Sequence, residues 1–216
     1  MLPRLYAIID AQLCAQRGIA PVDQAQALVS AGCTLLQYRN KNQAQQGSAR
    51  AMLTDALAIR SLAPPNIKLI MNDRADLCLA ARFDGVHLGQ DDLSITSARK
   101  LCPPPLVIGS STHNADQLAV ADATSADYIA IGPIFATSSK ANPGPVVGLE
   151  GLRAIRNLTK KPMVAIGGIS IENCRSVIDS GADSIALISA LLPEACAADP
   201  AGSIRKRVEA FLEILR

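Results

Sequence analysis

The chain has 216 residues, of which 49% are hydrophobic, so it can bury one sizeable core. Its 21 basic and 19 acidic residues leave a net charge of +2, and it contains three Phe, three Tyr and no Trp. This composition argues against nucleic-acid binding through a basic, aromatic-lined surface, whereas a few well-placed cations suffice for an anionic small molecule.

The first half of the chain alternates apolar runs with amphipathic segments. Near-continuous apolar runs are typical of buried parallel strands, and the segments that follow them have helical spacing. The expected strands cover residues 4–10, 34–39, 68–71 and 85–88, and the expected helices cover 21–30, 48–62, 76–81 and 94–101.

The second half repeats this pattern, with expected strands at 106–109, 128–131, 162–166 and 184–187 and helices at 115–123, 148–158, 171–180 and 201–215. Eight strand–helix units predict an α/β fold, a single-domain (β/α)8 TIM barrel over residues 1–216. The alternative is an open doubly wound sheet, which normally has a Gly-rich phosphate turn after its first strand. Here that strand ends in IIDAQ, which favours the barrel.

The N-terminal run MLPRLYAIID leads directly into a strand, and no segment reaches about 18 uninterrupted apolar residues. The six cysteines are scattered, without a CxxC pair or zinc-type spacing. We therefore expect a soluble, cytoplasmic protein with no membrane or nucleic-acid partner, whose cysteines are buried thiols. A homo-oligomer is compatible with this sequence.

Polar and small side chains gather at the expected carboxyl ends of the strands. In a barrel these ends all lie at one face, where active sites are found. The set combines acids, cations and small residues, as a site for phosphorylated ligands and Mg²⁺ requires. Its members are Gln37, Arg39, Lys41, Asn72, Asp73, Asp91, Asp92, Ser111, His113, Thr137, Ser139, Lys140, Gly167, Gly168, Ile188 and Ser189.

Acids at the ends of two neighbouring strands suggest a magnesium site. Asp73 and Asp92 can each supply one oxygen ligand, with phosphate oxygens and water completing the octahedron. Either acid alone is equally well explained as a helix cap or turn residue. Their position on adjacent strands favours the metal, although spacing does not choose between Asp91 and Asp92.

Two further elements are suited to anions. Gln37, Arg39 and Lys41 alternate, so they face the same side of an extended strand and suit a diphosphate. Gly167-Gly168 and Ile188-Ser189 follow the last two strands, the usual phosphate site of such barrels, although a purely structural Gly-Gly turn is the alternative. These elements imply two phosphorylated ligands, or one long ligand.

Two histidines and one long loop lie outside the metal and anion elements described above. His87 lies within an apolar strand, where we expect a structural role, and His113 stays open as an acid–base group. The longest irregular stretch, residues 133–147, is interpreted as a functional loop such as a lid, because the chain is otherwise economical.

Taken together, these motifs resemble the thiamine-phosphate synthase (thiamine-phosphate pyrophosphorylase) family from end to end. The motifs on which this resemblance rests are Gln37-x-Arg39-x-Lys41, Asn72-Asp73, DGVHLGQDD, GSSTH with Ser111, GPIFATSSK, and IGGI followed by GADSIALISA. The resemblance implies a Mg²⁺-dependent transferase of thiamine biosynthesis. Its substrates are 4-amino-2-methyl-5-hydroxymethylpyrimidine diphosphate and a thiazole phosphate, in the hydroxyethyl or carboxylated form. Diphosphate departs, and the thiazole nitrogen captures the resulting pyrimidine carbocation to give thiamine phosphate.

The resemblance also implies residue roles. Asp73 and Asp92 hold Mg²⁺, and the catalytic set is Arg39, Lys41, Ser111 and Lys140. The pyrimidine diphosphate set is Gln37, Tyr38, Arg39, Asn40, Lys41, Asn72, Ser111 and Lys140. The thiazole phosphate set is Thr137, Ser138, Ser139, Gly168, Ile188 and Ser189. Two departures from the family pattern are Asn40, where an acid is common, and Ser139, where Thr is common.

Two alternative functions remain. A thiazole tautomerase on the same barrel would bind a single thiazole phosphate and use a histidine, so His113 supports it, whereas Arg39, Lys41 and the acids have no use there. A non-catalytic sensor of phosphorylated ligands is the second, and the lack of an expected output domain speaks against it.

Overall fold

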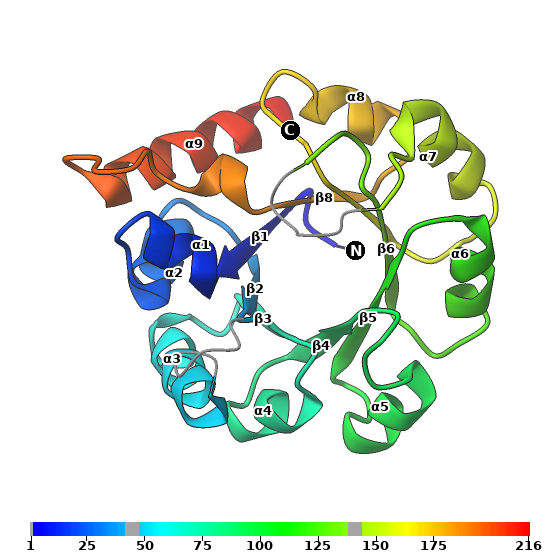
Figure 1. The fold of residues 1–216 in the computed structure, drawn as a ribbon, viewed down its shortest axis with the longest axis horizontal. Coiled ribbons are helices and arrows are strands. Elements are labelled where there is room, and N and C mark those ends of the chain that lie inside the picture. The colour runs from blue at the N-terminus through cyan, green and yellow to red at the C-terminus, as the bar shows by residue number, and fades with distance from the viewer. Residues whose placement is uncertain (1, 42–47, 138–143) are drawn as a thin grey trace.

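A computed structural model describes residues 2–41, 48–137 and 144–216 and confirms the expected (β/α)8 barrel (Figure 1). Each strand pairs in parallel with the next, and β8 closes on β1. The strands are β1 (Leu5–Asp10), β2 (Leu35–Arg39), β3 (Lys68–Asn72), β4 (Gly85–Leu88), β5 (Val107–Thr112), β6 (Tyr128–Ile131), β7 (Met163–Ile166) and β8 (Ser184–Leu187).

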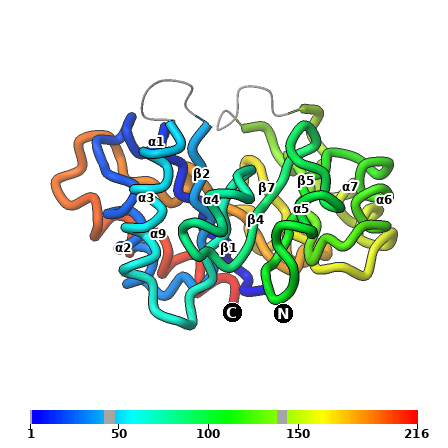
Figure 2. The backbone as a smooth tube through the Cα atoms, turned by 90° about the horizontal axis from the view of Figure 1, so that it is seen from below, coloured from blue at the N-terminus to red at the C-terminus, as the bar shows by residue number. Residues whose placement is uncertain are grey.

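Helices form the outer ring of the barrel (Figure 1). Figure 2 shows both chain ends at the end of the barrel opposite α1, which follows the carboxyl end of β1. The carboxyl-end face is therefore built from the loops that leave the strands. The helices are α1 (Ala11–Gln16), α2 (Pro21–Ser30), α3 (Ala49–Leu62), α4 (Ala75–Ala80), α5 (Ile95–Leu101), α6 (Ala115–Asp122), α7 (Gly148–Arg156), α8 (Cys174–Asp179), the 3-10 helix η2 (Ser189–Leu191) and α9 (Pro200–Ile214).

The strands bury both of their faces in two separate cores. Side chains such as Ile9, Leu36 and Met71 point outward and pack against the helices. Alternate residues point inward and fill the barrel, because successive side chains of a strand face opposite sides. The inner cluster consists of Tyr6, Ile8, Leu35, Ile70, Tyr128, Ala130, Val164, Ala186 and Ile188.

Three aspartates brace the barrel at the end away from the strands' carboxyl ends. Each aspartate stands just before an even-numbered strand and accepts a hydrogen bond from a backbone N–H near the start of the neighbouring odd-numbered strand. Each also forms an ion pair with an arginine of the helix that precedes this odd-numbered strand. These ion pairs lie at the amino ends of the strands and therefore do not occupy the rim formed by the carboxyl ends. The sets are Asp84 with Leu69 N–H (2.9 Å) and Arg60, Asp127 with Ile108 N–H (2.7 Å) and Arg99, and Asp183 with Met163 N–H (2.8 Å) and Arg156.

Three local differences from the sequence expectation affect the rim. Helix α1 was not expected; it begins directly after β1 because the Asp10 carboxylate accepts the Leu13 N–H at 3.0 Å. Strand β5 runs on to Thr112, which places Ser111 within the strand. Helix α8 begins at Cys174 rather than 171, because the Asn173 side chain bonds the Ser170 N–H and the Gly168 carbonyl and holds a turn there.

All six cysteines lie in the described ranges, and each is a free thiol. Five are buried, as expected, and Cys196 is exposed. Burial raises the pKa of Cys14, Cys33 and Cys78 to about 12, so these thiols stay protonated. None of the helices in the described ranges is both long and apolar enough to span a bilayer.

Candidate active site

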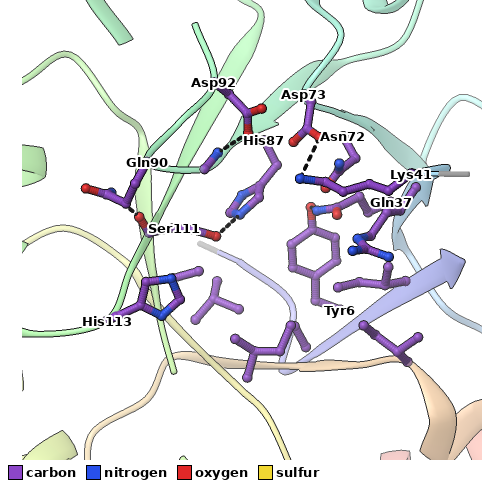
Figure 3. Close-up of a pocket in the computed structure, with 18 of the residues that line it drawn as sticks. Tyr6, Gln37, Lys41, Asn72, Asp73, His87, Gln90, Asp92, Ser111 and His113 are labelled. Carbon is purple, nitrogen blue, oxygen red and sulfur yellow. Dashed lines mark hydrogen bonds and ion pairs between the residues drawn. The ribbon is translucent and has the colours of Figure 1, made fainter. Parts of the chain in front are cut away.

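The carboxyl ends of the strands surround a cavity of about 440 Å³ (Figure 3). Its floor is the inner core of the barrel, with Ile8, Val164 and Ala186 exposed to it. Its walls carry polar side chains from strands β2 to β5 and the loops after them, the position where barrels of this kind carry out chemistry. It brings together the predicted residues Gln37, Arg39, Lys41, Asn72, Asp73, Asp92 and Ser111.

Arg39 is held by a partner that the sequence analysis did not identify. Asp10 lies opposite Arg39 in the β1–β2 register, and the two side chains form an ion pair. Asp10 is 2% exposed and Arg39 13%, so water screens the pair weakly. Asp10 therefore both caps α1 and orients the guanidinium at the cavity wall. The strand LYAIID ends in this acid, which was the available signal.

Lys41, Asp73 and Asp92 form a second charged group (Figure 3). Lys41 Nζ lies 2.9 Å from Asp73 Oδ2, and the Asp73 carboxyl group hydrogen-bonds that of Asp92. Asp92 also accepts the Gly89 N–H at 2.7 Å. Asp73 has a φ of 61°, an unusual left-handed conformation that aspartate tolerates, and its own N–H donates to the His87 carbonyl at 2.8 Å.

The close approach of the two acids shifts their titration. Burial, followed by contact with the Asp92 carboxyl group, raises the pKa of Asp73 to about 6, although Lys41 opposes the shift. Burial acts to raise the pKa of Asp92, but hydrogen bonds from Asp73 and the Gly89 N–H outweigh it and lower that pKa. Two carboxyl groups in contact form a position where a cation can bind.

The donor set fits a magnesium ion better than a metal held by protein alone. Within residues 2–41, 48–137 and 144–216, no three His, Cys, Asp or Glu side chains come together as a metal site. Asp73 and Asp92 supply two hard oxygen ligands, and Mg²⁺ commonly takes the rest of its octahedron from phosphate and water. The described lining is also acid-rich, with Asp73, Asp91 and Asp92 against Arg39 and Lys41.

Both histidines line the cavity. His87, expected to be structural, bonds Tyr128 Oη through Nδ1 at 2.9 Å and Ser111 Oγ through Nε2 at 2.8 Å. His113 Nδ1 lies 2.6 Å from the Gly132 carbonyl oxygen. A carbonyl only accepts, so Nδ1 carries the proton and Nε2 of neutral His113 is an acceptor.

A second, smaller cavity of about 50 Å³ adjoins the first. Ile166, Ala186 and Ile188 line both cavities and so form a shared wall. Gly168 has a φ of +64°, and a Cβ there would lie 2.5 Å from the Ala136 carbonyl oxygen, so the backbone turn requires glycine. The predicted phosphate residues Thr137, Gly168, Ile188 and Ser189 all line it.

Some predicted residues are not brought to the cavity. The Tyr38 hydroxyl donates to Asp55 at 2.6 Å, and Asn40 lines a separate depression with Asp55. Strand alternation turns both side chains toward the helices, away from Gln37 and Arg39. Ser138, Ser139 and Lys140 lie outside the described residues, as does the central part of the expected 133–147 lid.

Comparison with known proteins agrees with the geometry. The chain matches the thiamine monophosphate synthase family over residues 5–191. A thiamine-phosphate synthase of Koribacter versatilis is 55% identical over 99% of this chain and 96% of the relative, and one of Methanosarcina mazei is 38% identical over 98% and 82%. The solved thiamine phosphate pyrophosphorylase of Pyrococcus furiosus superposes with a TM-score of 0.81 and 33% identity over 98% of this chain and 95% of that chain. The resemblance seen in the motifs is confirmed, and the chain belongs to the thiamine-phosphate synthase family of enzymes.

Proposed function

We propose that the enzyme joins 4-amino-2-methyl-5-hydroxymethylpyrimidine diphosphate to a thiazole phosphate, releasing thiamine phosphate and diphosphate. The observation that carries this proposal is the pair of cavities with a common wall of Ile166, Ala186 and Ile188. The larger cavity has the size and polar groups for the pyrimidine diphosphate, and the smaller one offers a glycine turn to a phosphate. A ligand in each would place the two reacting rings against the shared wall.

With the hydroxyethyl form of the thiazole phosphate, the reaction needs one bond broken and one formed; the carboxylated form must in addition lose its carboxyl group as CO2. The bond between the pyrimidine methylene carbon and the diphosphate oxygen breaks, and its electron pair leaves with the diphosphate. The lone pair of the thiazole nitrogen then forms the new carbon–nitrogen bond, without a proton transfer. The protein's task is therefore to stabilise the leaving charge and to hold the rings in line.

Arg39, Lys41 and Ser111 are the described groups that face the leaving diphosphate. Arg39 is aimed by Asp10, so little reorganisation is needed when charge develops on the diphosphate. Lys41 is free to turn from Asp73 toward a phosphate, since its side chain is 48% exposed. We assign the same task to Lys140 on the basis of the family motif GPIFATSSK.

Asp73 and Asp92 would hold Mg²⁺ in this scheme. The ion supplies positive charge to the diphosphate oxygens and lowers the energy of the departing group. The acid-rich lining gives a physical reason for this requirement, because a diphosphate alone would be repelled by Asp73, Asp91 and Asp92.

The tautomerase alternative rests on His113, whose Nε2 is an acceptor at the cavity wall. That reaction needs one phosphate site and one base, and it leaves the Asp10–Arg39 pair and the two facing acids without a task. We therefore favour the synthase.

The first prediction concerns the reaction itself. Purified enzyme with both phosphorylated substrates and Mg²⁺ should form thiamine phosphate and diphosphate in equal amounts, measured by chromatography and a diphosphate assay. A carboxylated thiazole phosphate given alone distinguishes the two proposals, because a tautomerase would isomerise it in the absence of the pyrimidine diphosphate. Isomerisation with no thiamine phosphate from folded protein would contradict the synthase proposal.

The second prediction concerns the metal site. Asp92→Asn keeps an acceptor for the Gly89 N–H but removes a charge, so the Mg²⁺ concentration for half-maximal rate should rise by about tenfold or more. Asp91→Asn makes the same change next to it and should leave the Mg²⁺ dependence close to that of the wild type. Equal Mg²⁺ dependence in both variants would remove Asp92 from the metal site.

The third prediction concerns the buried partner of Arg39. Asp10→Asn keeps an acceptor for the Leu13 N–H, so α1 stays capped while the ion pair is lost. Unfolding free energy should fall by about 1–3 kcal/mol in urea titrations, because Arg39 keeps its charge without a charged partner.

In the same variant, kcat/KM for the pyrimidine diphosphate should fall about tenfold because the guanidinium is no longer aimed. Asp10→Ala, which also removes the cap, should cost about 1 kcal/mol more stability. An Asp10→Asn enzyme with wild-type kcat/KM would show that Asp10 does not position Arg39 for catalysis.

A further inference from the structure

We propose that Gln37, Tyr6, Tyr128, His87 and Ser111 form one directed hydrogen-bond chain across the barrel, and that its direction makes the Ser111 hydroxyl a donor and the Gln37 carbonyl an acceptor toward ligands. Tyr6, Tyr128 and His87 are then positioning residues. The direction of the chain is independent of the proposed function, whereas the identity of the ligands at its two ends rests on it.

The five side chains come from five strands and link end to end beneath the cavity. Gln37 Nε2 lies 2.7 Å from Tyr6 Oη, and Tyr6 Oη lies 3.0 Å from Tyr128 Oη. Tyr128 Oη lies 2.9 Å from His87 Nδ1, and His87 Nε2 lies 2.8 Å from Ser111 Oγ. The two tyrosines, Gln37 and His87 are buried, so each contact is made away from bulk water.

A glycine makes room for the middle of this chain. His87, Gly109 and Tyr128 occupy one row of the barrel in the β4–β5–β6 register. A Cβ on Gly109 would lie 2.0 Å from Tyr128 Cζ. Without it, the His87 and Tyr128 rings stack with centroids 5.5 Å apart and planes inclined at 20°. The absence of a side chain at Gly109 therefore allows the Tyr128 hydroxyl to reach the His87 imidazole.

If every one of these buried protons is used within the chain, only two directions are possible for the whole chain. Each phenol has one proton to donate, and a neutral imidazole has one N–H, so reversing one bond then reverses all of them. In the forward direction Gln37 donates to Tyr6, Tyr6 to Tyr128, Tyr128 to His87 Nδ1, and His87 Nε2–H to Ser111. In the reverse direction Ser111 donates first and the Gln37 oxygen accepts last.

The orientation of Gln37 selects the forward direction. Gln37 presents its amide nitrogen to Tyr6, which leaves its oxygen for a ligand. The proposed function agrees with this direction, because Ser111 lines the cavity that would hold the anionic diphosphate, and an anion requires a donor there. Burial raises the pKa of Tyr6 and of Tyr128 well above the ordinary value, so both phenols keep the protons that the chain needs.

The forward direction matches the chemistry of the two ends. The Ser111 proton can stabilise an oxygen of the departing diphosphate, and this bond strengthens as negative charge develops. The Gln37 oxygen can accept a hydrogen from the exocyclic amino group of an aminopyrimidine. One chain of buried hydrogen bonds therefore sets donor and acceptor at opposite walls of the same cavity.

The test is the protonation of the two His rings, which are the only histidines in the chain. In ¹⁵N-histidine-labelled enzyme, at a pH where the rings are neutral, we expect His87 to be protonated at Nε2 and His113 at Nδ1. The two tautomers give distinct nitrogen shifts, and a His113→Gln variant assigns them. His87 protonated at Nδ1, or divided equally between the two forms, would overturn the proposed direction.

A variant at the centre of the chain tests its consequence. Tyr128→Phe removes the donor to His87 Nδ1, so the tautomers should mix and kcat should fall about tenfold, with KM for the thiazole phosphate little changed. Tyr38→Phe is the matched control, because it removes a buried hydroxyl that bonds Asp55 outside the chain and should preserve the His87 tautomer.

The outcomes separate the two proposals. An unchanged tautomer and kcat in Tyr128→Phe would show that the chain does not position Ser111. A wild-type enzyme with the expected tautomers but no thiamine phosphate would refute the proposed function and leave the hydrogen-bond chain intact. If Tyr128→Phe does not fold, the wild-type spectrum still decides the direction, and Tyr6→Phe repeats the kinetic test.

Discussion

Closure of eight short parallel strands into one barrel is the constraint on which the rest of the structure depends. Because side chains alternate along each strand, closure sends every second residue into an interior that must be filled. Near the amino ends of the strands apolar residues such as Leu35 and Ile70 fill it, as a core does. Toward the carboxyl ends, the inward-facing positions are occupied by polar residues such as Gln37, Asn72 and His87, so the packed interior continues directly into the cavity.

The charged side chains at the rim of the cavity are positioned by ion pairs rather than by packing. Within the described residues, Arg39 is paired with Asp10 and Lys41 with Asp73, so both cations at the cavity already have anionic partners. The Asp10–Arg39 pair is buried and holds the guanidinium in place, whereas Lys41 is exposed enough to move. Asp73 and Asp92 lie together beside Lys41, and burial, followed by the contact with Asp92, raises the pKa of Asp73. The acids outnumber the cations in the described lining, which favours a ligand that arrives with a positive counter-ion.

Sequence patterns predicted the architecture because the strands begin as apolar runs and all the main helices between them have apolar residues at helical spacing. They also predicted which strand-end residues meet at the cavity, since parallel strands all end at one rim. They missed Asp10 because pairing with Arg39 depends on the register between β1 and β2, which no local pattern encodes.

The alternation rule supported Gln37, Arg39 and Lys41 but also shows why Tyr38 and Asn40, taken from a family motif as a block, turn away from the cavity. His87 was interpreted as structural because it lies inside an apolar strand. Its contact with Ser111 exists only because β5 continues past Gly109 and Gly109 leaves space for the stacked rings. Packing across three strands is a property of the closed barrel and is not visible along the chain.

We propose that this acid-rich cavity accepts a diphosphate only together with a divalent cation. Calorimetric titration of inorganic diphosphate into the enzyme, with and without Mg²⁺, measures this requirement. We expect measurable binding with Mg²⁺ and at least about tenfold weaker binding without it, because Asp73 and Asp92 repel the free anion. Equal affinity in the absence of Mg²⁺ would show that the cavity binds diphosphate without a cation.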